Sequence, residues 1–559
     1  MTPPADAARG PSPDGAQPDP VEHEVLVLGA GPGGLQLAYF LERAGTDYLV
    51  LEAGDAVGTF FRTLPRRREL ISFNKVHSVY DDPEVRLRWD WNSLLTEDYS
   101  LPFREFSEDL YPHADDLVRY LEAFARRGGL KVRTGCRVER IARREGGGAG
   151  GAPGGFELTA ADGARLRCRV LVIATGFGKP YVPDVPGIEH AEGYESAPLD
   201  EEAYRDQRVL ILGKGNSALE LADVALARAA LIHVASPTPV QLAWKTRHPG
   251  HVRAQHTRLL DMYQLKTLNG ALDCHVTGIA PTDDGRFAVG VSYVHADGET
   301  EELVYDRVLR CTGFRLDTAP FAPDCVPETI LDGRLPATTG MWESVNVPDL
   351  FFAGTLMQGH DYKRSSSAFI DGFRYNVRTL AHWLRHRYEG AALPVRTLDG
   401  TAEALRRHVV ERVCRTSSLW TQFGSLCDLF VVDEATGEVQ VHEDQPLRHV
   451  EETTGDLPHC YTLVFDWGRW DGDAFHVDRH PRHDEAHTNV FLHPILRRFR
   501  RGVKVAEHHV LEDLFGTYSA ATEPGVVRRR GGRDMESYHR EEHDEPLQRF
   551  FEEQLGGWP

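Results

Sequence analysis

Closely spaced cysteine pairs are missing from this sequence. Eight cysteines are scattered through 559 residues, and no two of them are separated by just two residues. This spacing excludes the usual redox-active dithiol and the usual zinc ribbon. Isolated thiols suit a reducing compartment, so we expect a cytoplasmic protein.

A net positive charge and long apolar runs are also missing. The net charge of −21 disfavours nucleic acids and anionic membranes as partners. No apolar run is long enough to cross a bilayer. The N-terminus is rich in Pro, Ala and Asp, without the apolar core of a secretory signal, and the C-terminus carries no retention address. We expect residues 1–20 to form a disordered tail.

A glycine-rich turn near the N-terminus is the strongest motif. Val25–Leu28 is a short apolar run typical of a buried parallel strand, and a helical pattern begins at Leu35. The intervening glycines suit a tight turn, close approach of a pyrophosphate and helix–strand packing. A second strand, Tyr48–Leu51, ends at Glu52, where a carboxylate accepts from a ribose hydroxyl. A plain α/β turn is the alternative, but we predict a dinucleotide site at Gly29, Gly31, Pro32, Gly33, Gly34 and Glu52.

The same pattern returns after the apolar strand Arg208–Leu212. The strand that follows it ends at Ser236, as far from Gly213 as Glu52 is from Gly29. Because no acid stands there to repel a 2′-phosphate, we infer that the second dinucleotide is NADPH. Lys214 stays open between a phosphate partner and a solvated lysine. The predicted NADPH-binding residues are Gly213, Gly215, Asn216, Ser217, Ala218, Lys245 and Arg247.

The order of the motifs predicts a domain interrupted by an insertion. Two apolar strands end in Thr-Gly, at Gly176 and Gly313, and a late strand runs into Gly354 and a helix. From about residue 391 the sequence becomes charged and rich in His. We therefore expect a first dinucleotide domain at 21–200 and 326–390, an NADPH domain at 201–325, and a C-terminal domain at 391–559 that covers the active site.

Three further features each leave two interpretations. Asn74 follows an apolar run and is either a satisfied core amide or faces a cofactor. Pro65–Arg68 is either a solvated face or a clamp for anions. Five histidines of the C-terminal segment invite a metal interpretation but form no clear ligand set, so we predict no metal; they are His476, His480, His483, His487 and His493.

These motifs together resemble the two-dinucleotide flavoprotein superfamily. GAGPGG with Glu52 resembles its FAD site, and GKGNSALE resembles its NADPH site. ATGFGKP and CTGF resemble its linker strands, and LFFAGT its final flavin motif, which adds Thr175, Gly176 and Gly354 to the FAD-binding set. Asn74 lies where flavin-containing monooxygenases keep an Asn beside the flavin and the nicotinamide.

A closer resemblance runs from about residue 24 to beyond 500. LISFNK, DWNSLL, YPHADDLVRYL, GIEHAEGYES, LLDMYQLKTLNG, GFRYNVR and NVFLHPI resemble an endoplasmic-reticulum flavoprotein family involved in degradation of misfolded proteins. This chain departs from that family in lacking its signal and retention tail. Its Arg-, Ala- and Gly-rich composition resembles that of high-GC actinobacteria. Bacterial relatives of this type include the nitrosuccinate-forming L-aspartate N-hydroxylases of antibiotic biosynthesis.

The resemblance implies an α/β fold with two Rossmann-like domains, for FAD and NADPH, and a C-terminal mixed segment. It implies an N-monooxygenase that uses O₂ to oxidise the amine of L-aspartate through hydroxylamine and nitroso stages to nitrosuccinate, by way of a C4a-hydroperoxyflavin. Self-association is left open. The residues it suggests are Asn74 and Lys75 for catalysis, and Arg66, Lys363, Arg364 and His493 for the substrate carboxylates.

Two other functions remain as alternatives. One is a flavin-dependent oxidoreductase that acts on another amine, or on thiols or disulfides, although the missing C-x-x-C counts against thiol chemistry. The other is a scaffold with vestigial nucleotide sites, which the intact glycines of both motifs disfavour.

Overall fold

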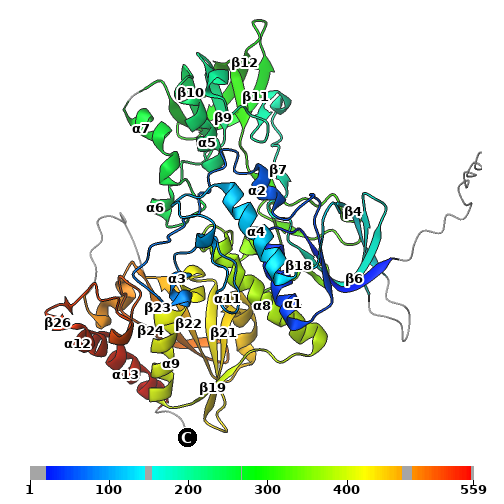
Figure 1. Cartoon of the computed structure of the whole chain (residues 1–559). Coiled ribbons are helices and arrows are strands. Elements are labelled where there is room, and N and C mark those ends of the chain that lie inside the picture. Colours follow the sequence, from blue (N-terminus) through cyan, green and yellow to red (C-terminus); the bar gives the residue numbers. More distant parts are fainter. Residues whose placement is uncertain (1–19, 145–153, 266, 469–480, 556–559) are drawn as a thin grey trace, which may run out of the picture.

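The computed structural model describes residues 20–144, 154–265, 267–468 and 481–555, which form three parts (Figure 1). Residues 1–19 of the expected tail, and His476 and His480, lie outside these ranges. Within the described ranges, no helix combines the length and apolar character needed to cross a membrane.

The first part is built around a mostly parallel sheet. Its central strand β1 (Val21–Leu28) lies between β2 (Tyr48–Leu51) and β6 (Arg165–Ile173). The order is β3-β2-β1-β6-β5-β4, with β3 (Val132–Arg133), β5 (Gly155–Ala160) and β4 (Val138–Arg144) toward the edges. Strand β18 (Leu350–Phe352) returns late in the chain to pair with β6. Helices α1 (Pro32–Ala44), α4 (Ala114–Gly128) and α8 (Ile370–Glu389) pack together beside this sheet (Figure 1).

The second part is the inserted lobe at the top of Figure 1. Its sheet has the order β13-β12-β11-β10-β9-β14-β8. The nucleotide-type core is β9 (Arg208–Leu212), α5 (Asn216–Ala225) and β10 (Leu231–Ser236). The other strands are β11 (Gly270–Pro281), β12 (Phe287–Tyr293), β13 (Thr300–Tyr305), β14 (Arg307–Arg310) and β8 (Glu192–Gly193). Because β8 belongs to this sheet, the lobe begins before residue 200, and the linker strands β7 (Lys179–Pro180) and β15 (Phe314–Arg315) pair beneath it.

The C-terminal part is a six-stranded antiparallel sheet. Its order is β19-β21-β20-β22-β23-β24, formed by β19 (Arg396–Asp399), β21 (Glu438–Pro446), β20 (Leu426–Val432), β22 (Cys460–Trp467), β23 (Leu492–Arg500) and β24 (Val503–His509). Helices α9 (Ala402–Arg415) and α13 (Glu545–Leu555) pack against each other beside it.

The hydrophobic core shows how the parts are joined. One continuous cluster runs from Val27 and Leu37 of the first part to Phe430 and Phe465 of the C-terminal sheet. The inserted lobe keeps two clusters of its own, around Ile211 and around Leu210. The first and C-terminal parts therefore share one core, whereas polar and loop contacts attach the lobe.

Candidate functional site

The first glycine loop has room for a cofactor on one side and none on the other. A Cβ added to Gly34 would lie 1.9 Å from the Gly29 carbonyl oxygen, and one added to Gly33 would lie 2.5 Å from Gly354 Cα. Gly29 itself has φ +104°, a conformation that favours glycine. A Cβ at Gly31 would meet no atom within 4 Å. The open side at Gly31 is where a pyrophosphate would approach the start of α1.

Glu52 is held at the end of β2 by the loop itself. Its carboxylate accepts hydrogen bonds from the backbone N–H groups of Ala30 and Gly54, both at 2.8 Å. The side chain is buried, so its orientation is fixed before any ligand arrives. The backbone N–H groups at the start of α1, the open space at Gly31 and the anchored Glu52 together fit the adenosine half of FAD. Thr175 lies exposed after β6, next to Gly176 with φ +76°.

The second glycine loop has the same backbone arrangement as the first, but a cation lies where the first loop has an acid. A Cβ on Gly213 would lie 2.3 Å from the Cys311 carbonyl oxygen, whereas Gly215 faces open space. Lys214 is buried; its ammonium donates to the Ser236 carbonyl at 3.0 Å and forms an ion pair with Asp273. Lys214 is therefore not a solvated lysine. A cation occupies the end of β10, where the first loop has an acid.

Asn216 connects the NADPH loop to the first part of the chain. Its amide donates to the carbonyls of Gly250 and His251 and accepts from Arg253 N–H, at 3.0 to 3.2 Å. The Arg253 guanidinium then reaches across to donate to the Ile71 carbonyl at 3.0 Å and lies 4.4 Å from the Phe73 ring centre. This buried arginine brings the lobe next to Asn74, and the sequence analysis did not select it.

Asn74 is buried, and its amide nitrogen is satisfied by the protein. That nitrogen donates to the Ser107 carbonyl at 2.7 Å and the Asp109 carbonyl at 3.2 Å. Its Oδ1 makes no hydrogen bond to any residue in the described ranges and remains available as an acceptor. Asn74 and the exposed Lys75 also line a cavity of about 160 Å³.

Two buried carboxylates follow the final flavin motif. Burial raises the pKa of Asp361 to about 6 and that of Asp371 to about 7. One oxygen of each has no hydrogen-bond partner in the described structure. Asp371 lies in the first turn of α8, near the charge of Arg374, and its own charge acts on Arg253. One aspartate lies in a loop and the other in the first turn of a helix, and their spacing in the sequence matches no motif. Sequence patterns therefore did not predict them.

The four residues suggested for substrate do not form one cluster. Both ring nitrogens of His493 are occupied, by the Phe491 carbonyl at 2.7 Å and by His509 at 2.8 Å. Arg66 donates to the carbonyls of Tyr194 and Ala197, both at 2.7 Å. These bonds give Arg66 and His493 structural roles in this conformation. Lys363 and Arg364 are exposed neighbours in the loop before α8, and the Lys363 charge reaches His248 of the lobe.

The two cations suggested for the 2′-phosphate behave differently. Arg247 donates to the Val490 carbonyl, and its guanidinium lies 4.4 Å from the ring centre of Trp467, so it connects the lobe to the C-terminal part. Lys245 is exposed on the short helix α6 (Ala243–Thr246). Of the two, Lys245 remains the one with a free side chain among the described residues.

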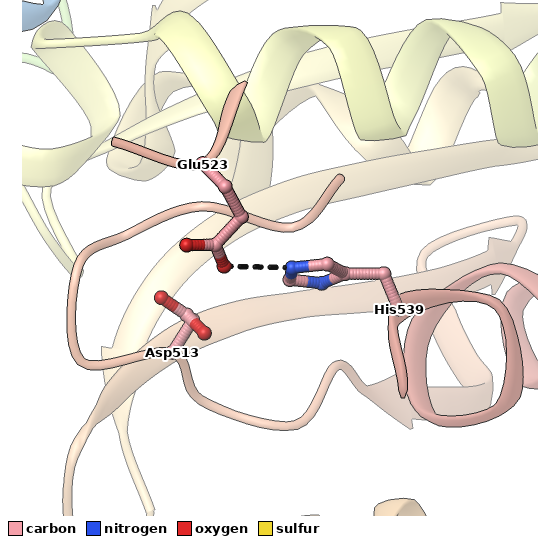
Figure 2. A group of neighbouring side chains, drawn as sticks. All are labelled: Asp513, Glu523 and His539. Atoms are coloured by element: carbon pink, nitrogen blue, oxygen red, sulfur yellow. Dashed lines mark hydrogen bonds and ion pairs between the residues drawn. The ribbon is translucent and has the colours of Figure 1, made fainter. Parts of the chain in front are cut away.

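A cluster of two acids and one histidine lies in the C-terminal part (Figure 2). His539 Nε2 donates to Glu523 Oε1 at 2.9 Å, while Asp513 forms an ion pair with Arg530. The other Asp513 oxygen accepts from Phe515 N–H and from Thr517. Arg530 neutralises Asp513, and Glu523 Oε1 also accepts from Thr517, so hydrogen bonds link this group into a brace of the C-terminal segment, with Glu523 Oε2 left without a partner in the described structure.

None of the eight cysteines forms a disulfide, and seven are buried. Burial raises the pKa of Cys168 to about 12 and that of Cys460 to about 11. A redox-active thiol needs the opposite shift.

The family model for pyridine nucleotide-disulphide oxidoreductases matches residues 26–354, which is more than half of the chain. The chain belongs to this family. It is 35% identical over 530 residues to the FAD-dependent oxidoreductase domain-containing protein 2 of Danio rerio, covering 86% of this chain and 76% of that one. Over 204 residues it is 32% identical to indole-3-pyruvate monooxygenase YUCCA1 of Oryza sativa subsp. japonica, covering 35% and 43%. A flavin-containing monooxygenase from Stenotrophomonas maltophilia superposes with a TM-score of 0.49 at 21% identity, covering 65% and 99%.

Family membership confirms the predicted fold class and the cofactor pair. The protein is a flavoprotein oxidoreductase of a family that includes monooxygenases, with FAD and NADPH as cofactors. The two open glycine faces and the anchored Glu52 are this chain's own features that fit those dinucleotides. The family's name refers to disulfides, but the buried thiols offer no candidate for that chemistry within the described residues.

Proposed function

We propose that the protein is an FAD- and NADPH-dependent N-monooxygenase that oxidises the amine of L-aspartate to nitrosuccinate, through hydroxylamine and nitroso stages. When bound, FAD reduced by NADPH supplies the activation of O₂. The chain's own residues bind and orient the substrate, exclude water and move a proton. Each of the three oxidations would consume one O₂ and one NADPH.

Arg253 is the observation that carries the proposal. Its guanidinium is buried between the lobe and the Phe73–Asn74 segment, with Phe73 and Trp91 rings at 4.4 and 5.3 Å. A planar guanidinium is suited to recognise a carboxylate through two parallel hydrogen bonds. A dicarboxylate substrate needs such a cation, and Lys363 and Arg364 supply further positive charge at the loop before α8.

Proton removal is the second requirement, because an ammonium has no lone pair with which to attack oxygen. Asp371 is suited to accept that proton: it is buried, one oxygen is unpartnered, and burial raises its pKa to about 7. The Asn74 Oδ1 is an acceptor that can hold a nicotinamide or an amine N–H. Thiol chemistry is disfavoured because no described cysteine has the lowered pKa of a nucleophile.

Steady-state kinetics of Arg253→Gln would test the proposal. We expect KM for L-aspartate to rise at least about tenfold, the usual consequence of losing a charged bidentate contact, while flavin content stays unchanged. Arg127→Gln is the matched control, because Arg127 is exposed in the last turn of α4, outside the residues assigned to the site. An unchanged KM in Arg253→Gln, with turnover intact, would remove Arg253 from the substrate site.

Asn74→Ala would test the cofactor side of the same site. We expect it to keep FAD but to release more hydrogen peroxide per NADPH consumed, because the acceptor that positions the reactants is lost. Coupling equal to that of the unaltered protein would show that Asn74 is only a satisfied core amide.

A further inference from the structure

A cavity of about 530 Å³ lies outside both dinucleotide sites. It opens where α8 of the first part meets α9 and β21 of the C-terminal part (Figure 1), and neither glycine loop nor Asn74 contributes to its wall. Its volume falls in the range of small-molecule sites in proteins. The shared hydrophobic core on both sides makes the wall a fixed part of the fold.

Most charged groups of the wall are already used. Arg412 pairs with Asp428 and Asp444, both at 2.7 Å, and Arg378 also pairs with Asp444. The remaining assigned groups are Glu443 at 3.7 Å from Arg412, Arg415 at 2.8 Å from Asp82, and Glu84, which accepts from Ser417 and Tyr99. These contacts hold the wall together: the Glu84 oxygens already accept from Ser417 and Tyr99, and Glu443 lies beside Arg412.

Two charged groups are left over, and they have opposite signs. Arg396 of β19 and Glu411 of α9 are exposed residues that line the cavity, without a hydrogen bond or ion pair to any residue in the described part of the chain. Glu411 lies three residues after His408 on α9, and strand β19, which carries Arg396, contacts α9.

His408 supplies a third unused group. Its side chain is only 5% exposed, and its Nε2 is buried without a hydrogen-bond partner in the described structure. Buried polar atoms are nearly always hydrogen-bonded, so this nitrogen indicates that a polar atom belongs in the cavity. Burial lowers the pKa of His408, which leaves the ring neutral and able to donate or accept.

The rest of the wall is mixed. Trp383 of α8, Met341, Leu393 and Val441 form its apolar part, and polar side chains line the remainder: Tyr99, Thr379, His382, Thr416 and Gln445. We propose that this cavity binds a zwitterionic α-amino acid with an apolar side chain. Arg396 takes the carboxylate, Glu411 takes the ammonium group, His408 Nε2 bonds a polar atom of the ligand, and the side chain packs on Trp383.

Isothermal titration calorimetry on the full-length, flavin-loaded protein is the test. The probes are L-phenylalanine, phenethylamine, which lacks the carboxylate, and 3-phenylpropionate, which lacks the ammonium group. L-Phenylalanine should bind at least about tenfold more tightly than either, since each partial probe leaves one charged group unpaired.

Two variants test which residue binds the carboxylate of the ligand and which binds its ammonium group. Arg396→Gln should weaken L-phenylalanine about tenfold and leave phenethylamine unchanged, whereas Glu411→Gln should weaken L-phenylalanine and leave 3-phenylpropionate unchanged. Arg407→Gln and Glu403→Gln are controls on the same helix α9, exposed and outside the wall. Undetectable L-phenylalanine binding at about 5 mM, equal affinity for all three probes, or unchanged affinity in both cavity variants would overturn the proposal. Flavin absorbance checks that each variant is folded.

Discussion

The two glycine loops share a backbone and differ in the charge at the following strand end. In the first, Glu52 accepts from two loop N–H groups; in the second, Lys214 donates to the Ser236 carbonyl and pairs with Asp273. Both loops leave their middle glycine open. We infer that the glycines set the approach of a dinucleotide, whereas the residue at the strand end selects the ribose.

The largest expected effect concerns a position where the loops differ. Gly34→Ala places a methyl group 1.9 Å from the Gly29 carbonyl, and we expect it to cost roughly 3 kcal/mol of unfolding free energy and most bound flavin. The equivalent residue in the second loop is already Ala218. Ala218→Gly should therefore cost about 1 kcal/mol at most. Denaturant unfolding checks both, and a Gly34→Ala protein as stable as the unaltered one would contradict the packing account.

A second prediction concerns the pH dependence of stability at Asp371, which has an unpartnered oxygen, unlike Asp273, which is paired with Lys214. Burial raises the folded pKa of Asp371 to about 7, above the unfolded value near 4. The folded chain therefore holds the extra proton, and the stability it confers is present below pH 4 and is lost as pH rises to about 7. Asp371→Asn should remove this loss, a gain on the order of 2–4 kcal/mol at pH 8.

Urea unfolding of the unaltered protein and of Asp371→Asn, at pH 5 and at pH 8, measures this gain in stability. The gain should shrink at pH 5, where Asp371 is largely protonated. A difference between the two proteins that is the same at both pH values would contradict the raised pKa.

A third prediction converts the second strand end into the first. Ser236→Asp puts a carboxylate where the 2′-phosphate is expected, and the preference for NADPH over NADH should fall by about 10- to 100-fold in kcat/KM. Ser236→Asn is the neutral control of similar size. An unchanged preference would mean that Ser236 does not face the ribose.

The smallest expected effect is on stability, and it should differ between the neighbouring cations Arg247 and Lys245. Arg247→Ala should cost about 1–2 kcal/mol of stability measured without NADPH, because the contacts with Trp467 and the Val490 carbonyl are lost. Lys245→Ala should change stability by less than about 0.5 kcal/mol and raise KM for NADPH instead. If Arg247→Ala raised KM for NADPH without loss of stability, the original phosphate assignment would be right.

Sequence patterns predicted the parts of this molecule that depend on local periodicity. The strand–glycine–helix units at Gly29 and Gly213, and the late return of β18 beside β6, follow from short-range patterns. The side-chain partners could not be predicted in this way. Arg253 reaches Ile71 across 182 positions of sequence, and His493 is occupied by His509 through pairing of β23 with β24. Only the tertiary fold determines such contacts.

The most direct measurement is NADPH consumption and peroxide release with and without L-aspartate, with the products identified by mass spectrometry. We expect accelerated NADPH consumption, little peroxide, and a nitrosuccinate mass formed with three NADPH per molecule. Slow consumption that aspartate does not change, with all reducing equivalents recovered as peroxide, would contradict aspartate as the substrate while leaving the flavoprotein family intact.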